Sequence, residues 1–269
     1  MKIVFLGGGN MAAALIGGML ERGFAACDVV VVELASERRE WLARSFGVGV
    51  AADVGGVPGA DVVVLAVKPQ QMREALAPLA GGLGDALVIS VAAGLRVADL
   101  SRWLGGHAQV ARAMPNTPAL IGAGVTGVYA PQAVDAAGRE LAERILSAVG
   151  SVVWVDDEAR MDSITAVSGS GPAYVFHFIE ALEAAAVSRG FDAATARRLA
   201  LDTVLGAARL ASSSEDPPAV LREKVTSKGG TTAAALAVFG EGDLVGLVGR
   251  AVAAAEARGR ELGDELGAR

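Results

Sequence analysis

The placement of Gly7, Gly9 and Ala12 near the start of the chain constrains its fold more than any other feature. An apolar, strand-like run at residues 2–6 precedes them, and helical spacing follows. Gly7 permits a tight bend, Gly9 lets the backbone approach a pyrophosphate, and Ala12 lets the helix pack close to the strand. A second apolar strand at 28–33 completes a βαβ unit. The pattern therefore predicts a dinucleotide-binding turn rather than a plain tight turn, because it stands directly between a strand and a helix.

The alternation of apolar strands and helical segments continues to residue 157. Further strands are predicted at 61–67, 86–91, 109–114, 124–129 and 151–155, with helices at 70–79, 97–104 and 133–149. Strands that alternate with helices in this way favour a parallel sheet covered by helices. Residues 1–157 are therefore predicted to form a Rossmann-type doubly wound sheet that binds NAD(P), and the fold class is α/β.

From Glu158 onward the pattern is almost wholly helical. Helices are predicted at 173–189, 192–212, 218–224, 232–239 and 243–266. They are rich in Ala and poor in aromatic residues, so each has little apolar area to bury and a monomeric bundle would have a thin core. Residues 158–269 are therefore predicted to form an all-α dimerisation domain.

The composition excludes several classes of partner. The 269-residue chain has a net charge of -6 and lacks a Lys/Arg-rich run, which argues against binding to nucleic acid or to an anionic membrane. Its apolar strand-like runs are too short to span a membrane, and the glycines at 7–9 interrupt the early apolar stretch that a signal peptide would need. Its one cysteine, Cys27, has neither a disulfide partner nor metal-ligand neighbours in the sequence. We expect a cytoplasmic protein without a bound metal.

Charges after the second strand leave the choice of cofactor open. Glu33 stands where a carboxylate accepts hydrogen bonds from the adenosine ribose, which favours NADH. Ser36, Arg38 and Arg39 could instead hold the additional phosphate of NADPH, or they could form only the solvated start of a helix. The expected cofactor is therefore NADPH or NADH.

Small or rigid residues follow three later strands, at the edge of the sheet where ligands bind. These segments are 66–69, 92–94 and 112–118. Small residues there would let a nicotinamide ribose lie against the backbone, whereas the alternative is an ordinary strand-to-helix turn.

The loop at residues 225–232 is a second candidate anion site. It contains Gly229 and Gly230, four Ser/Thr hydroxyls and the start of a new helix, whose first N–H groups have no helical partners. One chain with two such loops suggests a nucleotide cofactor and a small acid as ligands.

In order and spacing, these motifs resemble the pyrroline-5-carboxylate reductase family. The resemblance is carried by residues 7–11, 67–69, 92–94, 114–118, 168–174 and 225–232. It implies an N-terminal Rossmann domain, a C-terminal helical domain that interlocks with a second subunit, and active sites at the dimer interface. The implied assembly is a homodimer or a higher assembly of dimers.

The resemblance also assigns individual residues. The implied contacts of the imine acid are Glu158, Glu215, Ser227, Gly229, Gly230, Thr231 and Thr232, with Thr232 as the donor to the imine nitrogen. The cofactor contacts expected from the motifs themselves are Gly7, Gly9, Asn10, Met11, Glu33, Ser36, Arg38, Ala66, Val67, Lys68, Pro69, Ala93, Gly94 and Asn116. Lys228 departs from the family, which usually has proline at this position, and the role of Lys224 is left open.

The resemblance implies reduction of 1-pyrroline-5-carboxylate to L-proline, the last step of proline biosynthesis. Two alternatives remain at the level of sequence. One is a related reductase of another cyclic imine or a small oxo acid, since a difference of one ring atom cannot be read from these residues. The other is a dinucleotide-binding regulator without catalytic activity.

Overall fold

The computed structural model describes residues 1–57 and 59–268, which form two compact units. The first unit combines Met1–Ser170 with Ala254–Arg269, and the second is Gly171–Ala253. The sequence pattern changes at residue 158, whereas the boundaries between the units fall after Ser170 and after Ala253. The reason is that α6 (Arg160–Ile164) and the C-terminal part of α11 (Leu244–Gly267) pack with the first unit, although their sequences are helical like those of the second.

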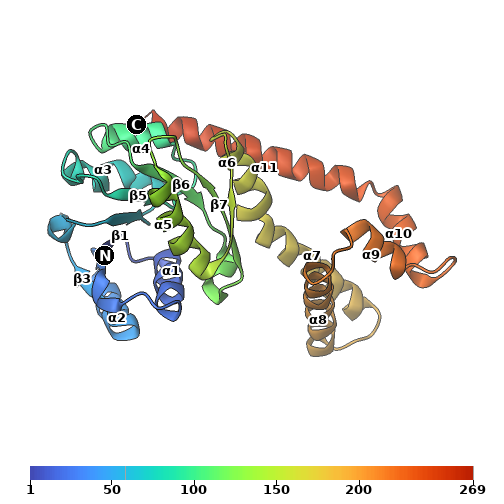
Figure 1. Cartoon of the computed structure of the whole chain (residues 1–269). Coiled ribbons are helices and arrows are strands. Elements are labelled where there is room, and N and C mark those ends of the chain that lie inside the picture. The colour runs from blue at the N-terminus through green and yellow to red at the C-terminus, as the bar shows by residue number, and fades with distance from the viewer. Residues whose placement is uncertain (58, 269) are drawn as a thin grey trace. The chain divides into compact units, whose positions relative to one another are not determined.

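The first unit is built on a sheet that is mostly parallel (Figure 1). Its strands are β1 (Ile3–Leu6), β2 (Val29–Val32), β3 (Gly49–Ala51), β4 (Val62–Leu65), β5 (Leu87–Ser90), β6 (Val110–Met114), β7 (Gly124–Tyr129) and β8 (Gly150–Trp154). Within the described residues, the eight strands lie in the order β3-β2-β1-β4-β5-β6-β7-β8. The direction of winding reverses between β1 and β4, and ligands of open α/β sheets bind at the carboxyl ends of the strands beside such a reversal.

The strand pair β6 and β7 departs from the predicted parallel arrangement. Arg112 pairs with Tyr129 and Met114 with Gly127 in an antiparallel register, whereas β7 and β8 are parallel. A parallel crossover needs a dozen or more residues, and the segment 115–123 is too short for one. The short edge strand β3 was not predicted either, because three residues give little periodicity to detect.

Helices cover both faces of this sheet (Figure 1). They are α1 (Asn10–Glu21), α2 (Ser36–Phe46), α3 (Met72–Leu76), α4 (Val97–Trp103) and α5 (Ala136–Leu146), besides α6. In β1, Ile3 and Phe5 point into an apolar core that includes α1 and α5, while Val4 and Leu6 point into a second core formed with α3 and α4. Because successive side chains of a strand alternate between faces, burial on both sides explains why the strands read as continuous apolar runs.

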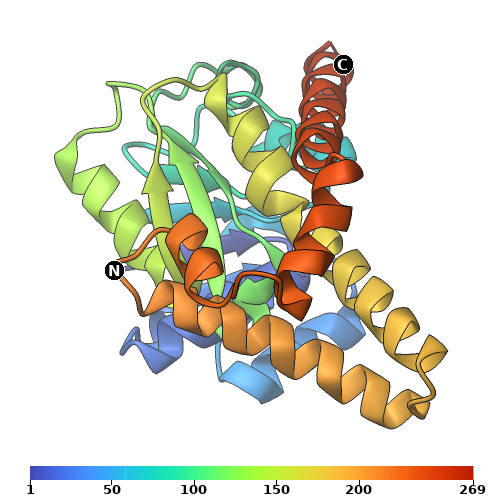
Figure 2. The same ribbon diagram turned by 90° about the vertical axis from the view of Figure 1, so that its right-hand side faces the viewer.

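The second unit consists of helices with few buried side chains. Its helices are α7 (Gly171–Ser188), α8 (Ala193–Ser212), α9 (Pro218–Lys224), α10 (Thr231–Glu241) and the first part of α11. Helices α7 and α8 form a hairpin (Figure 2). Among the described residues of this unit, only Ala196 and Ala200 are buried, while Phe176 is 59% exposed and Val245 is 86% exposed. Large exposed apolar surfaces of this kind mark interaction sites.

In the described part of the chain, no single helix is long and apolar enough to cross a bilayer. Helices α10 and α11, which meet at a bend of 49°, are together long and apolar enough for such a span by length and composition alone.

Candidate functional site

The glycine turn lies at the carboxyl end of β1, beside the reversal of winding. Gly7 has a φ of +97°, and a Cβ there would lie 2.9 Å from the backbone of Ala66, so only glycine fits without strain. Gly9 is the N-cap of α1 and has no atom within 4 Å of its Cβ position. The turn is therefore tightly packed against β4 but open in front of the helix start.

Asn10 and Met11 begin α1, and the first turn of this helix carries no acidic side chain. The first N–H groups of a helix have no partners within the helix, and its N-terminus carries partial positive charge. With open space at Gly9, this end of α1 can accept a pyrophosphate, which is the role predicted for Gly7, Gly9, Asn10 and Met11.

A cleft of about 620 Å³ runs along this edge of the sheet. Of the predicted cofactor residues, it brings together Gly7, Gly9, Glu33, Ala66, Val67 and Lys68. Its further lining residues include Asp53, Gln71 and Glu74, which the sequence interpretation missed. Asp53 caps the turn after β3, and the signal for that strand was too short to place it. Among the described residues, the cleft lining does not include the other predicted cofactor residues, which are Asn10, Met11, Ser36, Arg38, Pro69, Ala93, Gly94 and Asn116.

Glu33 and Arg38 both form hydrogen bonds with the backbone of Gly8 in the glycine turn. The Glu33 carboxylate accepts hydrogen bonds from the N–H groups of Gly8 and Ala35, each at 2.9 Å. Arg38 donates from Nε to the carbonyl of Gly8 at 2.6 Å, and its guanidinium carbon lies 4.1 Å from the ring centroid of Trp41. The Arg38 Nη2 atom is the one buried side-chain N or O atom without a hydrogen-bond partner among the described residues. A buried N–H group usually has a partner, so this atom is an exception to the usual pairing of buried donors.

Asn116 and Gly94 shape the neighbouring strand ends. Asn116 is buried, donates from Nδ2 to the carbonyl of Ser168 at 3.1 Å, and accepts from the N–H of Val125 at 3.0 Å. Both ends of its amide are therefore used within the protein. Gly94 has a φ of +78° in the loop between β5 and α4, and Ala93 beside it is exposed. Such a loop can present backbone to a flat ligand.

The loop before α10 has the geometry of an anion site. Gly229 has a φ of +70°, and Gly230 is the N-cap of α10 and donates to the carbonyl of Ser227 at 3.0 Å. A Cβ on Gly230 would lie 3.2 Å from the carbonyl oxygen of Ser227 and would require the Ser227 hydroxyl to rotate away. Thr231 and Thr232 open the helix, with Thr231 exposed and Thr232 half-buried. Because the N-cap is a glycine, no side chain of the cap bonds to the N–H groups of this first turn.

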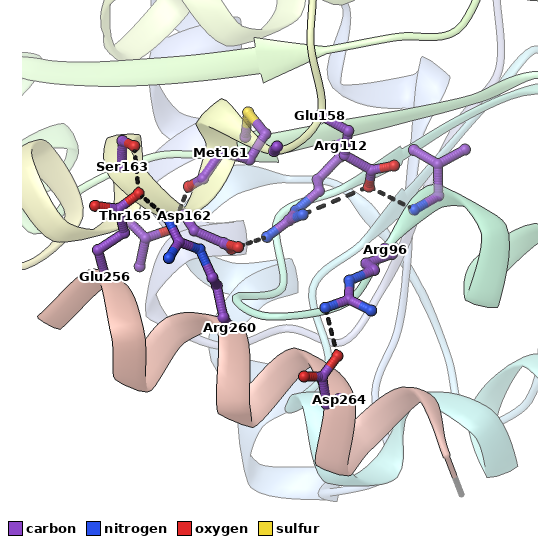
Figure 3. Close-up of polar contacts among 12 residues, drawn as sticks. Arg96, Arg112, Glu158, Met161, Asp162, Ser163, Thr165, Glu256, Arg260 and Asp264 are labelled. Carbon is purple, nitrogen blue, oxygen red and sulfur yellow. Dashed lines mark hydrogen bonds and ion pairs between the residues drawn. The ribbon is translucent and has the colours of Figure 1, made fainter.

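The two predicted substrate carboxylates lie in different environments. Glu158 accepts through Oε1 from the N–H of Val97 at 2.8 Å and from Arg112 Nη1 at 3.4 Å, and it belongs to the first unit (Figure 3). Glu215 is exposed and belongs to the second unit, as does the loop before α10. Next to Glu215, Asp216 forms an ion pair with Lys224, which gives that lysine a structural partner.

Arg112 is a buried cation on β6 that was not assigned a role from the sequence. Its side chain is 4% exposed and lies between Glu158 and Asp162, with Nη2 at 3.3 Å from Asp162 Oδ1 (Figure 3). The side chain holds Glu158 and α6 against the end of the sheet. A buried charge is normally paired, so an arginine within an apolar strand was the signal in the sequence that a carboxylate partner had to be nearby.

The first unit has the architecture of a known class of enzymes. Residues 2–94 match a family model described as NADP oxidoreductase, coenzyme F420-dependent. With the glycine turn, the reversal of winding and the cleft beside it, this match defines a dinucleotide-dependent oxidoreductase with a Rossmann domain.

Comparisons over the whole chain define the family. Residues 158–262 match a family model described as pyrroline-5-carboxylate reductase dimerisation. The chain is 46% identical over 268 residues to pyrroline-5-carboxylate reductase of Pseudomonas aeruginosa, which covers 99% of this chain and 98% of the relative. The chain therefore belongs to the pyrroline-5-carboxylate reductase family, and the predicted resemblance is confirmed.

Solved structures agree with the fold over nearly the full length. The pyrroline-5-carboxylate reductase of Coxiella burnetii has a TM-score of 0.93 and 42% sequence identity, covering 97% of this chain and 98% of that one. The Plasmodium falciparum pyrroline carboxylate reductase, solved with NADP bound, has a TM-score of 0.86 and 27% identity, covering 98% of each chain. The predicted α/β fold with a Rossmann domain followed by a helical dimerisation domain is confirmed.

Proposed function

We propose that this protein reduces 1-pyrroline-5-carboxylate to L-proline with a hydride from NADPH or NADH. The observation that carries the proposal is a pair of helices, α1 and α10, that each begin at a glycine N-cap without a side-chain cap. Each presents free N–H groups to an anion, so the chain offers one site for a pyrophosphate and one for a small carboxylate. The full-length similarity to curated reductases of this name supports the same assignment.

The proposed cofactor contacts are those predicted from the sequence. Gly7, Gly9, Asn10 and Met11 hold the pyrophosphate, and the strand ends at 66–69 and 93–94 with Asn116 shape the remainder of the site. Glu33 and Arg38, with Ser36 beside them, act at the adenosine end. The guanidinium of Arg38 is proposed to favour a phosphate there, whereas Glu33 stands in the same place and favours a free ribose.

The proposed substrate site uses the loop at 227–232. The N–H groups of Thr231 and Thr232, with the hydroxyls of Ser227 and Thr231, hold the carboxylate, while Gly229 and Gly230 let the backbone approach it. Glu158 and Glu215 are further proposed substrate contacts. In Glu158, Oε1 is used by Val97 and Arg112, so Oε2 is the atom proposed to face the ligand.

The chemistry asks the chain mainly for placement. A nicotinamide cofactor held at the first site would supply the hydride for the imine carbon, and the imine nitrogen would take up a proton in the reduction. Thr232, half-buried in the first turn of α10, is proposed to donate a hydrogen bond to the lone pair of the neutral imine nitrogen, the atom at which that proton is taken up.

The helical domain makes the protein a homo-oligomer, as the dimerisation family model and the exposed apolar helices both indicate. We propose a homodimer as the unit and an assembly of such dimers as the complete particle. The absence of a second cysteine beside Cys27 supports a reducing, cytoplasmic location.

The decisive experiment is turnover of the imine acid with NADPH or NADH, followed by loss of nicotinamide absorbance and by detection of proline. Small oxo acids and other cyclic imines, assayed in parallel, test the related reductase. A protein that binds the cofactor but turns over none of these substrates would be a regulator, and the proposal would fall.

Thr232→Val tests the proposed donor, because it keeps the volume and removes the hydroxyl. We expect a rate loss of roughly 10–1000-fold, as for the loss of one positioned donor. Thr203→Val is the matched control, since Thr203 only donates to the carbonyl of Leu199 within α8. Near-normal turnover in a folded Thr232→Val protein would transfer the role to water or to another side chain.

A further inference from the structure

The C-terminal part of α11, which belongs to the first unit, carries three glycines at four-residue spacing. They are Gly259, Gly263 and Gly267, and positions four apart lie on one face of a helix. A Cβ on Gly263 would lie 3.0 Å from the carbonyl oxygen of Gly94, and one on Gly267 would collide with the carboxylate of Asp99. A Cβ on Gly259 would lie no closer than 3.9 Å to its nearest neighbour. The helix backbone therefore comes into tight contact only in its last two turns.

The segment it contacts is the loop between β5 and α4, with α4 itself. Arg96, the N-cap of α4, reaches from Nη2 to Asp264 Oδ1 at 2.6 Å (Figure 3). Near the other end of α4, Arg102 donates from Nη2 to the carbonyl of Gly267 at 2.8 Å and pairs with Asp99 at 2.8 Å. Both ends of the short helix are thus fastened to α11, whose red C-terminal end lies beside α4 in Figure 1.

The same loop is held from a second direction by the buried pair. Glu158 accepts the N–H of Val97, the first residue of α4, at 2.8 Å. Arg112 donates to the same carboxylate oxygen at 3.4 Å (Figure 3). Gly94 takes a φ of +78° at the turn of this loop. A turn in that conformation, fixed from two sides, has little freedom to move when a ligand arrives.

Loop rigidity has a direct consequence for binding. A binding group that is already ordered before the ligand arrives loses less conformational entropy on binding. Ala93 and Gly94 in this loop are among the proposed contacts of the cofactor, so the contacts from α11 act on the shape of that site without touching the ligand.

We propose that the last two turns of α11 fix the β5–α4 loop in the conformation that binds the nicotinamide cofactor. Gly263 and Asp264 are positioning residues in this arrangement. The inference rests on the proposed function, because it requires Ala93 and Gly94 to contact the cofactor. It adds that a helix beginning in the dimerisation domain ends as part of the cofactor site's support.

The test compares two pairs of variants by their affinity for NADPH, measured directly from quenching or enhancement of fluorescence. Gly263→Ala and Gly259→Ala add the same methyl group to the same helix and both raise helix propensity. Only the first forces Gly94 to move, by a few tenths of an ångström. Asp264→Asn breaks the pair with Arg96, whereas Glu265→Gln breaks an exposed pair with Arg258 that has no contact with the loop.

We expect the Kd for NADPH to rise roughly three- to tenfold in Gly263→Ala and Asp264→Asn, since small misplacements of a binding group carry costs of this order. The two controls should stay within about twofold of the wild type. Asp264→Glu, which can restore the pair, should recover most of the affinity. Thermal midpoints should stay close to the wild-type value in Asp264→Asn, because Arg96 and Asp264 are 43% and 68% exposed and exposed pairs contribute little to stability.

Equal Kd values in Gly263→Ala and Gly259→Ala would overturn the proposal. So would an affinity loss in Asp264→Asn that Asp264→Glu fails to recover. These outcomes are distinct from failure of the proposed function, which would appear as a wild-type protein that binds neither NADPH nor NADH, or binds without turning over the imine acid.

Discussion

Replacing Arg112 by Met should destabilise the protein through the carboxylates it leaves behind. The arginine side chain is 4% exposed, while the side chains of Glu158 and Asp162 are 24% and 13% exposed. Removing one partner of a buried ion pair costs about 3–5 kcal/mol, because the remaining charge stays desolvated and unpaired.

The structure places this cost at or below the lower end of that range. The two contacts of Arg112, at 3.4 Å and 3.3 Å, are longer than the 2.7–2.9 Å of a strong charged hydrogen bond, and both carboxylates retain some access to water. We expect a loss of about 2–3 kcal/mol. For a chain of this size, that corresponds to a fall in Tm of roughly 4–12 °C.

The assay is thermal unfolding followed by circular dichroism, at one fixed protein concentration because oligomer stability depends on it. Arg44→Met is the control, since Arg44 and Glu40 form a pair at 4.0 Å with side chains 76% and 71% exposed. It should cost no more than about 0.5 kcal/mol. Arg112→Met combined with Asp162→Asn should recover part of the loss. If Arg112→Met and Arg44→Met shift Tm equally, the buried cation does not hold this region together.

Three further predictions concern the proposed cofactor, substrate and assembly. Glu33→Ala should raise the ratio of catalytic efficiency with NADPH to that with NADH, and should weaken the binding of both cofactors because Glu33 also accepts the N–H of Gly8. Arg38→Ala should lower the same ratio. An unchanged ratio in both variants would contradict these assignments. Lys228→Gln should raise the KM of the imine acid by no more than about fivefold with little change in salt dependence, because Lys228 is exposed and such ion pairs contribute only ~0–1 kcal/mol; a much larger rise with loss of salt sensitivity would place the ammonium on the substrate carboxylate. Light scattering at micromolar concentration should give at least a dimer, and an active monomer would refute a role for the 171–253 unit in assembly.

The fold was predictable where the sequence signal is local. The apolar run that becomes β4, Val62–Leu65, and the glycine turn after β1 need no distant partner to be recognised. The strand β7 was predicted, but its antiparallel direction was missed because a strand of either direction has the same periodicity. Only the length of the segment 115–123 indicates the direction of β7, because a connection this short cannot make a parallel crossover.

The site was less predictable because it joins residues that are remote in sequence. Asp53, Gln71 and Glu74 come together with the glycine turn only through the order of the strands. The pairing of Arg112 with Glu158 crosses 46 positions of sequence. The sequence gives the residue types but not the distances between them. Arg112 could therefore be recognised as a strand residue that needs a charged partner, but the sequence did not show that the partner is Glu158.

Two helix starts in this chain differ in their caps from the two that are proposed to bind ligands. Helices α5 and α8 begin at Asp135 and Asp192, whose carboxylates accept N–H groups of their own first turns. Helices α1 and α10 begin at Gly9 and Gly230 instead. Glycine costs a helix only a few tenths of a kcal/mol relative to such a cap, and it leaves the N–H groups and the positive end of the dipole for another acceptor.

An aspartate at either of those glycines would satisfy the helix from within and place a negative charge where a pyrophosphate or a carboxylate is proposed to bind. Local helix stability and anion binding therefore favour different residues at the same position. The glycines at the starts of α1 and α10 are the residues expected when binding an anion outweighs capping the helix.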